Sequence, residues 1–116
     1  MKFIEAAPFS RQRPSLMTDE ELNALMAHLE EHPQSGDAIP GTGGFRKIRW
    51  ANSQRNKGKR SGSRTIYLLV SLVDTIHFFA IYDHAEKDDL TAAEKRELAA
   101  IARELKDLAK GERRTP

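Results

Sequence analysis

Two apolar segments in the second half of the chain do most to constrain its fold. Residues 64–70 read RTIYLLV and residues 75–82 read TIHFFAIY, so both are rich in β-branched and aromatic side chains. Side chains of these types favour extended backbone, and only residues 71–74 separate the two segments. We therefore expect an antiparallel hairpin whose two strands lie at the centre of a sheet.

A third strand is predicted just before this hairpin, where apolar and basic side chains alternate. Ile48 and Trp50 fall on one face of an extended segment, and Lys47 and Arg49 fall on the other. One face of this strand should therefore be buried and the other exposed. Residues 51–62 are polar and contain glycine, which predicts a mobile connection to the hairpin.

A capping box marks the start of a helix at Thr18. In the sequence TDEE, the Thr18 side chain accepts a hydrogen bond from the backbone of Glu21, whose carboxylate accepts one from the backbone of Thr18 in return. Leucine and methionine then recur at helical spacing, and Pro33 disfavours helical backbone in the residue before it. We expect this helix to end at His32.

A second capping box, Thr91 to Glu94, begins a C-terminal helix that we predict over residues 91–110. Gly111 is expected to end this helix and to leave residues 112–116 frayed.

The order of these elements indicates the fold class. A short edge strand is expected over residues 2–5, followed by the first helix, three antiparallel strands and the last helix. Helices segregated from an antiparallel central sheet predict an α+β fold of two layers. A chain of 116 residues suffices for one modest core, so we expect residues 1–116 to form a single domain.

The composition argues against two kinds of structural feature, cysteine-based cross-links or metal sites and membrane-spanning helices. The chain contains no cysteine, which excludes disulfides and thiolate-ligated metal sites. No apolar run approaches the roughly 20 residues that a membrane-spanning helix needs. We expect a soluble, cytoplasmic protein with no membrane partner.

Basic side chains are concentrated in residues 46–64, the strand-loop-strand region. This region holds eight Lys and Arg residues and no Asp or Glu, whereas the rest of the chain holds eleven basic and seventeen acidic residues. A segment of one charge sign attracts polyanions such as RNA even though the net charge is only +2. A solvated loop is the alternative interpretation, but solubility alone is served by mixed signs.

Several short motifs follow one another from this region onward. They are GGFRKIRWA at 43–51, GKRSGSR at 58–64, Ile66-Tyr67, Tyr82, Glu86-Lys87 and Asp89-Leu90-Thr91. In their order and spacing these motifs resemble toxins of the RelE superfamily, in its HigB-like branch, and the similarity runs from about Phe3 to the last helix. The resemblance implies a small microbial-ribonuclease-like fold.

The resemblance also implies an activity and partners. Such a protein is the toxin of a bacterial type II toxin–antitoxin system, an mRNA interferase that enters the ribosomal A site and cuts the messenger there, which inhibits translation. Its expected partners are the ribosome, mRNA and a cognate antitoxin, often of helix-turn-helix type. No cofactor or metal ion is expected.

The family's catalytic positions can be carried over through the motifs. The resemblance puts basic catalytic residues at Lys47 and Arg49 on one central strand and at Arg64 at the start of the next. The last strand runs into Tyr82-Asp83-His84-Ala85-Glu86, so His84 stands where this branch usually has lysine. This departure leaves open whether His84 preserves, retunes or removes the activity.

The chemistry of RNA cleavage fits these residue types. Attack by the RNA's own 2′-hydroxyl needs a base, cations to stabilise charge on the scissile phosphate, and an acid for the leaving oxygen. We assign the charge stabilisation to Arg49 and Arg64, and Lys47 to the base or to a phosphate contact. His84 is the candidate acid, because imidazole titrates near neutral pH.

Further RNA contacts are predicted for side chains around these positions. They are Arg46, Arg55, Lys57, Lys59, Arg60, Tyr82 and Lys87. Tyr82 either stacks on a base or simply closes its strand, and both interpretations stay open.

Two other functions compete with the nuclease. The same basic region can belong to a RelE-like protein that binds RNA or a protein partner without cleaving anything, if His84 marks a lost activity. A DNA-binding regulator is the weaker alternative, because the basic residues lie on predicted strands and a loop instead of a recognition helix.

Overall fold

A computed structural model describes residues 1–50, 62–83 and 89–114, and no side chain is described beyond residue 111. The described residues form five strands: β1 (Lys2–Glu5), β2 (Asp37–Ala38), β3 (Phe45–Trp50), β4 (Ser63–Val70) and β5 (Thr75–Asp83). They also form three α-helices, α1 (Ala7–Leu16), α2 (Asp19–Glu31) and α3 (Ala92–Arg114), and a short 3-10 turn, η1 (Ser71–Val73).

The strands form one mixed sheet in the order β1-β5-β4-β3-β2. The three central strands β3, β4 and β5 are antiparallel, and β1 lies at an edge, which confirms the predicted hairpin, third strand and edge strand. The edge strand β1 runs parallel to β5, so the sheet as a whole is mixed. The overall class is α+β.

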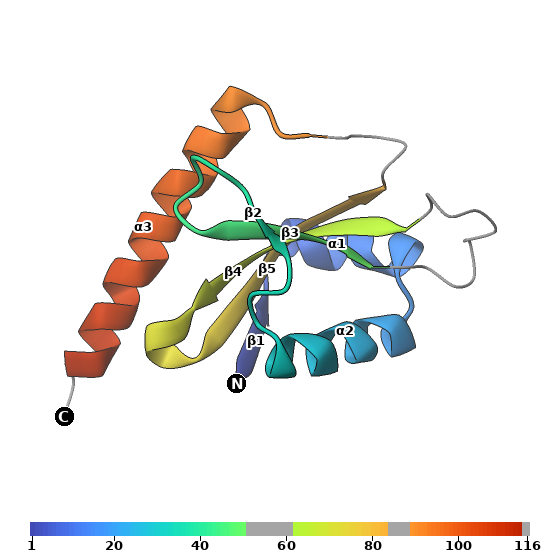
Figure 1. Ribbon diagram of the computed structural model, residues 1–116, viewed down its shortest axis with the longest axis horizontal. Helices are drawn as coiled ribbons and strands as arrows, with labels where there is room; N and C mark the ends of the chain where they lie inside the picture. Colours follow the sequence, from blue (N-terminus) through green and yellow to red (C-terminus); the bar gives the residue numbers. More distant parts are fainter. Residues whose placement is uncertain (51–61, 84–88, 115–116) are drawn as a thin grey trace.

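Helices cover both faces of this sheet (Figure 1). Along β4, Ile66 and Leu68 pack in the cluster under α3, whereas Tyr67 and Leu69 pack with α1 and α2 on the other face. A strand that is apolar on both faces needs a cover on each. The prediction of two layers was therefore wrong, because the fold has three: α1 and α2, the sheet, and α3.

Helix α1 was not predicted, because the two prolines in its sequence argue against a helix. It carries Pro8 in its first turn, where proline is tolerated, and Pro14 in its interior, where proline removes a backbone hydrogen bond. What stabilises α1 is a tertiary contact: the fully buried Phe9 ring stacks on Phe78 of β5, with 5.0 Å between the ring centroids. This contact holds α1 on the sheet.

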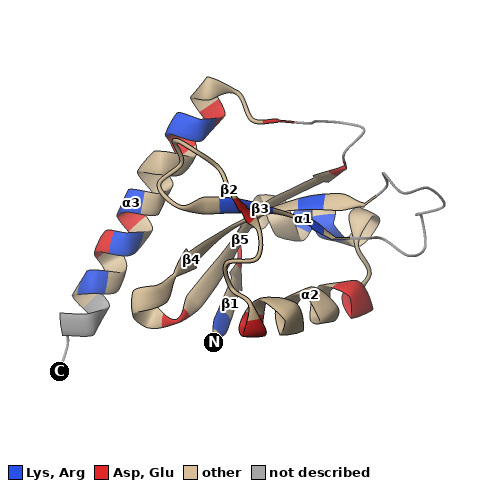
Figure 2. Cartoon of the chain, viewed as in Figure 1, with Lys and Arg blue, Asp and Glu red and all other residues tan. Residues whose placement is uncertain are grey.

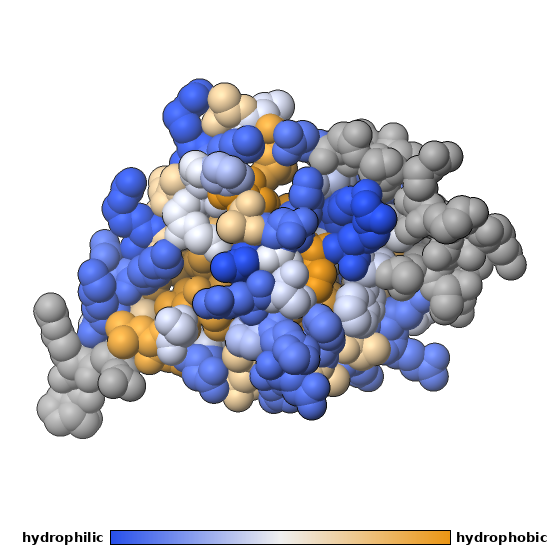
Figure 3. Space-filling view, viewed as in Figure 1, coloured by the Kyte–Doolittle hydropathy of each residue, from blue (hydrophilic) through white to orange (hydrophobic). Residues whose placement is uncertain are grey.

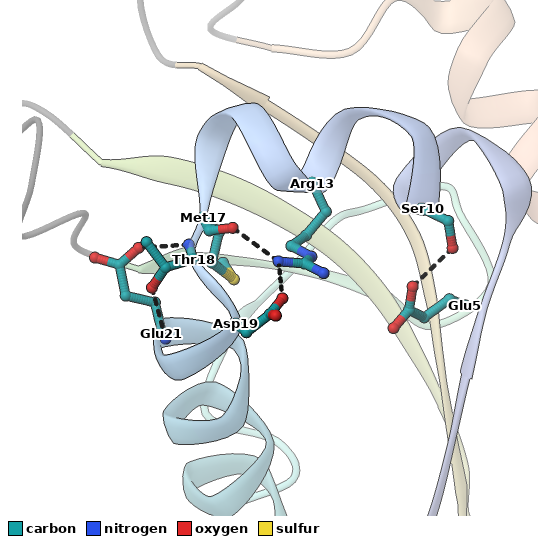
Figure 4. Close-up of polar contacts among 7 residues, drawn as sticks. All are labelled: Glu5, Ser10, Arg13, Met17, Thr18, Asp19 and Glu21. Carbon is teal, nitrogen blue, oxygen red and sulfur yellow. Dashed lines mark hydrogen bonds and ion pairs between the residues drawn. The ribbon is translucent and has the colours of Figure 1, made fainter.

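A polar corner joins α1 to α2 (Figure 4). Arg13 Nη1 donates to the Met17 carbonyl oxygen at 3.0 Å and lies 2.7 Å from Asp19 Oδ1. The capping box is confirmed, since Glu21 N donates to Thr18 Oγ1 at 3.0 Å and Thr18 N donates to Glu21 Oε1 at 2.9 Å. The predicted end of α2 is also confirmed, with Glu31 as its last residue.

Helix α3 begins as predicted and ends later than predicted. Its capping box is formed: Thr91 N donates to Glu94 Oε1 at 2.8 Å and Glu94 N donates to Thr91 Oγ1 at 3.1 Å. The predicted end at Gly111 was wrong, because Gly111 keeps a negative φ and α3 continues to Arg114. A glycine ends a helix only where the backbone turns left-handed, and in a helix interior it costs about 1 kcal/mol relative to alanine.

Although α3 has 23 residues, neither it nor another helix within the described ranges carries the long apolar stretch that crossing a membrane requires.

The substitution Phe9→Ala tests the packing of α1. We expect the free energy of unfolding to fall by about 3–5 kcal/mol, because a fully buried aromatic ring is lost and leaves a cavity against Phe78. Urea denaturation followed by circular dichroism measures the change. Gln12→Ala, at an exposed position of the same helix, is the matched control. A loss below about 1 kcal/mol for Phe9→Ala would show that α1 does not pack on the sheet in this way.

Candidate functional site

The pairing of the central strands brings the predicted catalytic cations together. Arg49 on β3 lies directly opposite Arg64 on β4, and Lys47 lies opposite Ile66 one pair further along. Directly opposite residues project from the same face with Cβ atoms roughly 5 Å apart, and residues two apart in one strand also share a face. Lys47, Arg49 and Arg64 therefore form one cluster, here called the cationic patch.

The opposite face of β3 is the buried one, as the alternation predicts. Ile48 belongs to the core cluster with α1 and α2, and Trp50 packs against it. Trp50 Nε1 donates to the Glu21 carbonyl oxygen of α2 at 3.0 Å, and the indole lies 5.3 Å from the His28 ring. Trp50 is thus a core residue that faces away from the cationic patch.

The three cations differ in exposure. Arg64 is only 7% exposed, Lys47 is half-buried and Arg49 is exposed. Arginine keeps its charge even when buried, and like charges directly opposite each other in a sheet are destabilising. An anion placed between Arg49 and Arg64 offsets that repulsion, and the planar guanidinium groups match phosphate oxygens in a bidentate geometry.

Arg46 lies apart from the cationic patch, on the face that α2 covers. Its Nη1 atom donates to the carbonyl oxygens of Gln34 at 3.2 Å and Gly36 at 2.7 Å. The neighbouring Tyr67 hydroxyl accepts from Gly36 N at 3.0 Å and donates to the Pro33 carbonyl oxygen at 2.9 Å. Arg46 and Tyr67 thus clasp residues 33–36 against the sheet, and Arg46 has a structural role here.

Burial raises the pKa of the Tyr67 phenol, and the backbone amide of Gly36 and the charge of Arg46 partly oppose that rise. Tyr67 therefore stays protonated at neutral pH and keeps the hydrogen that it donates to Pro33.

Tyr82 lies directly opposite Arg64, on the same face as the cationic patch. It is 8% exposed and belongs to the core cluster that includes Ile66 of β4 and Leu98 of α3. The Tyr82 ring therefore packs between the sheet and α3, beside Arg64 on the adjacent strand β4.

Six of the predicted site residues lie outside the described ranges. They are Arg55, Lys57, Lys59, Arg60, His84 and Lys87.

The structure adds one acidic residue that the sequence did not single out. The two-residue strand β2 pairs with β3 and places Asp37 directly opposite Lys47, on the face of the cationic patch. Opposite charges at such a position stabilise strand pairing by about 0.2–1 kcal/mol. A two-residue strand is too short to leave a periodic signal, so only the paired register reveals Asp37.

The charges of the molecule are unevenly distributed. Figure 2 shows basic residues along β3 at the centre of the view, acidic residues at both ends of α2, and a mixture on α3.

Within the ranges that the structure describes, no three His, Asp or Glu side chains gather as a metal site requires.

The substitution Arg49→Gln tests the repulsion between Arg49 and Arg64. Added salt screens like charges, so raising NaCl from about 0.05 to 0.5 M should stabilise the wild type more than Arg49→Gln, by up to about 1 kcal/mol. Urea denaturation at both salt concentrations measures this difference. Arg103→Gln removes the same charge from an exposed position on α3 and should respond like the wild type. An equal salt response of wild type and Arg49→Gln would contradict the proposed repulsion.

No protein-family model matches the chain.

Proposed function

We propose that this protein is a RelE-like toxin of the HigB-like branch, an endoribonuclease that cuts mRNA on the ribosome and is held inactive by a cognate antitoxin. The order of its motifs supports the family assignment, and one structural observation supports the proposed cleavage chemistry. Lys47, Arg49 and Arg64 lie on one sheet face in adjacent cross-strand positions. That is the arrangement needed to seat one phosphate group among several cations.

In this proposal the two arginines stabilise the negative charge that develops on the scissile phosphate. Arg64 is held in place by its burial in β4, so little reorganisation accompanies the reaction. Arg49 is exposed and lies directly opposite Arg64 on β3, so its side chain can contact the phosphate from the adjacent strand. The attacking group is the 2′-hydroxyl of the RNA, which makes the reaction independent of a metal ion.

The two proton transfers fall to Lys47 and His84 in this mechanism. Lys47 removes the 2′-hydroxyl proton or contacts the phosphate, and Asp37 opposite it supplies a nearby carboxylate. His84 donates the proton to the leaving 5′-oxygen.

The partners follow from the charge. RNA phosphates and an acidic antitoxin segment both complement the cationic patch and the excess of basic residues in the sequence from 46 to 64. Occupation of the patch by an antitoxin would exclude the phosphate, which is one route to inhibition.

A second candidate is a RelE-like protein without catalytic activity that uses the same patch to bind RNA or a protein partner. The observation in its favour is His84, which replaces the lysine usual in the branch.

Substitution of the arginines tests the nuclease. Expression of the wild type in a bacterial host should arrest growth and produce cut messengers, and Arg64→Ala or Arg49→Ala should slow cleavage about 100-fold or more, since each removes a cation from the transition state. Primer extension on a reporter messenger measures the cleavage rate. Arg103→Ala, on the outer surface of α3, is the control that removes an equal charge elsewhere.

The outcomes separate the two candidates. Cleavage at the wild-type rate in both Arg64→Ala and Arg49→Ala would falsify the catalytic assignment. A wild type that sediments with ribosomes or RNA and cuts no messenger supports the binding protein instead. Because Arg49 is exposed, Arg49→Ala reports on function even if Arg64→Ala fails to fold.

A further inference from the structure

A small pocket lies between β5 and the first turns of α3. Its volume is about 140 Å³, and its walls include Phe79, Ala80 and Tyr82 from β5 and Glu94, Glu97 and Leu98 from α3. Figure 3 shows apolar surface where the first turns of α3 meet the sheet, with hydrophilic surface around it. The volume is well below the range of about 300–1,000 Å³ of drug-sized sites, so the pocket suits a single ring system.

The pocket lies next to the cationic patch in the register of the sheet. Two rows of paired residues cross the sheet from β3 through β4 to β5, namely Lys47, Ile66 and Ala80 in one row and Arg49, Arg64 and Tyr82 in the other. Each row begins at a cation and ends at a wall of the pocket. Neighbouring strands lie about 4.8 Å apart, so the two ends of a row are about 10 Å apart. A phosphate held on β3 and β4 therefore has its own base within reach of the pocket.

The walls carry the groups that recognise a base. Phe79, Tyr82 and Leu98 offer aromatic and apolar surface for the faces of a ring. Glu94 already accepts from the Thr91 backbone through its Oε1 atom, in the capping box of α3. Glu97 lies nearly one turn further along α3, is exposed, and makes no hydrogen bond or ion pair with the residues that the structure describes.

The Glu97 carboxylate selects between bases. An ionised carboxylate only accepts hydrogen bonds, so it favours a base whose edge presents donors. Guanine presents two adjacent donors, its N1–H and N2–H₂ groups, and both can pair with one carboxylate. Adenine has an acceptor beside its single amino group, so it makes the weaker partner.

We propose that this pocket is a nucleobase subsite that prefers guanine, and that Glu97 is its specificity-determining residue. The inference rests on the RNA-cleaving function proposed above and names the base next to the phosphate on which the cationic patch acts.

Binding of mononucleotides tests the inference without relying on cleavage. Guanosine 3′-monophosphate and adenosine 3′-monophosphate carry the same phosphate on two purines, and titration calorimetry with the full chain gives both dissociation constants. We expect the wild type to bind the guanosine nucleotide about tenfold more tightly, the size of discrimination expected of a bidentate contact to a base. Glu97→Gln should lose this preference while binding the adenosine nucleotide as tightly as the wild type or more tightly, since a negative charge near the phosphate is gone.

Two further variants sharpen the test. Ala80→Leu fills the pocket from β5 without changing any charge and should abolish the preference. Glu104→Gln, two turns beyond Glu97 on α3 and outside the pocket, should keep it. Glu97 is exposed, so Glu97→Gln is expected to fold even if Ala80→Leu does not.

Each outcome decides the matter. Equal affinity of the wild type for both nucleotides, or a preference that survives Glu97→Gln, overturns the subsite but leaves the phosphate-binding function standing. Failure of the wild type to bind either nucleotide overturns the subsite, whereas the proposed function is decided separately by messenger cleavage in the wild type and in Arg49→Ala.

Discussion

The central strand β4 is buried along nearly its whole length, and this burial organises the rest of the molecule. A strand with apolar side chains on both faces is stable only when each face is covered and both edges are paired. The helices α1 and α2 supply one cover, α3 supplies the other, and β3 and β5 pair its edges. Among the described residues, each strand and helix therefore lies on β4 or on a direct neighbour of β4.

The candidate site lies at the beginning of this strand, where a charged residue precedes the apolar ones. Arg64 is the second residue of β4 and is 7% exposed, compared with 1% for Leu68 in the same strand. Burying a guanidinium group is costly unless polar or anionic groups surround it. Arg64 lies directly opposite Arg49, in the row of paired residues that ends at Tyr82 in the wall of the pocket. In the proposed function this row holds the phosphate at the arginines and its base at the pocket.

Features with local causes could be predicted from the sequence. Both capping boxes depend on residues three apart, and the alternation that puts Lys47 and Arg49 opposite the buried face of β3 is a property of any strand. Features with distant causes could not be predicted. Helix α1 depends on Phe9 meeting Phe78, and the third layer depends on which face of β4 each helix covers. Asp37 and the pocket beside Tyr82 come from chain segments that only the folded sheet brings together.

The clasp formed by Arg46 and Tyr67 has a consequence for how this protein can evolve. A Cβ atom on Gly36 would lie 2.9 Å from Tyr67 Cε1 and 3.0 Å from the Lys47 carbonyl oxygen, so residue 36 has no room for a side chain. The residue that follows it in the chain is Asp37, opposite Lys47. Substitutions in the buried packing around Gly36 and Tyr67 are therefore coupled to the position of Asp37 on the other face of the sheet. Neither face can change independently of the other.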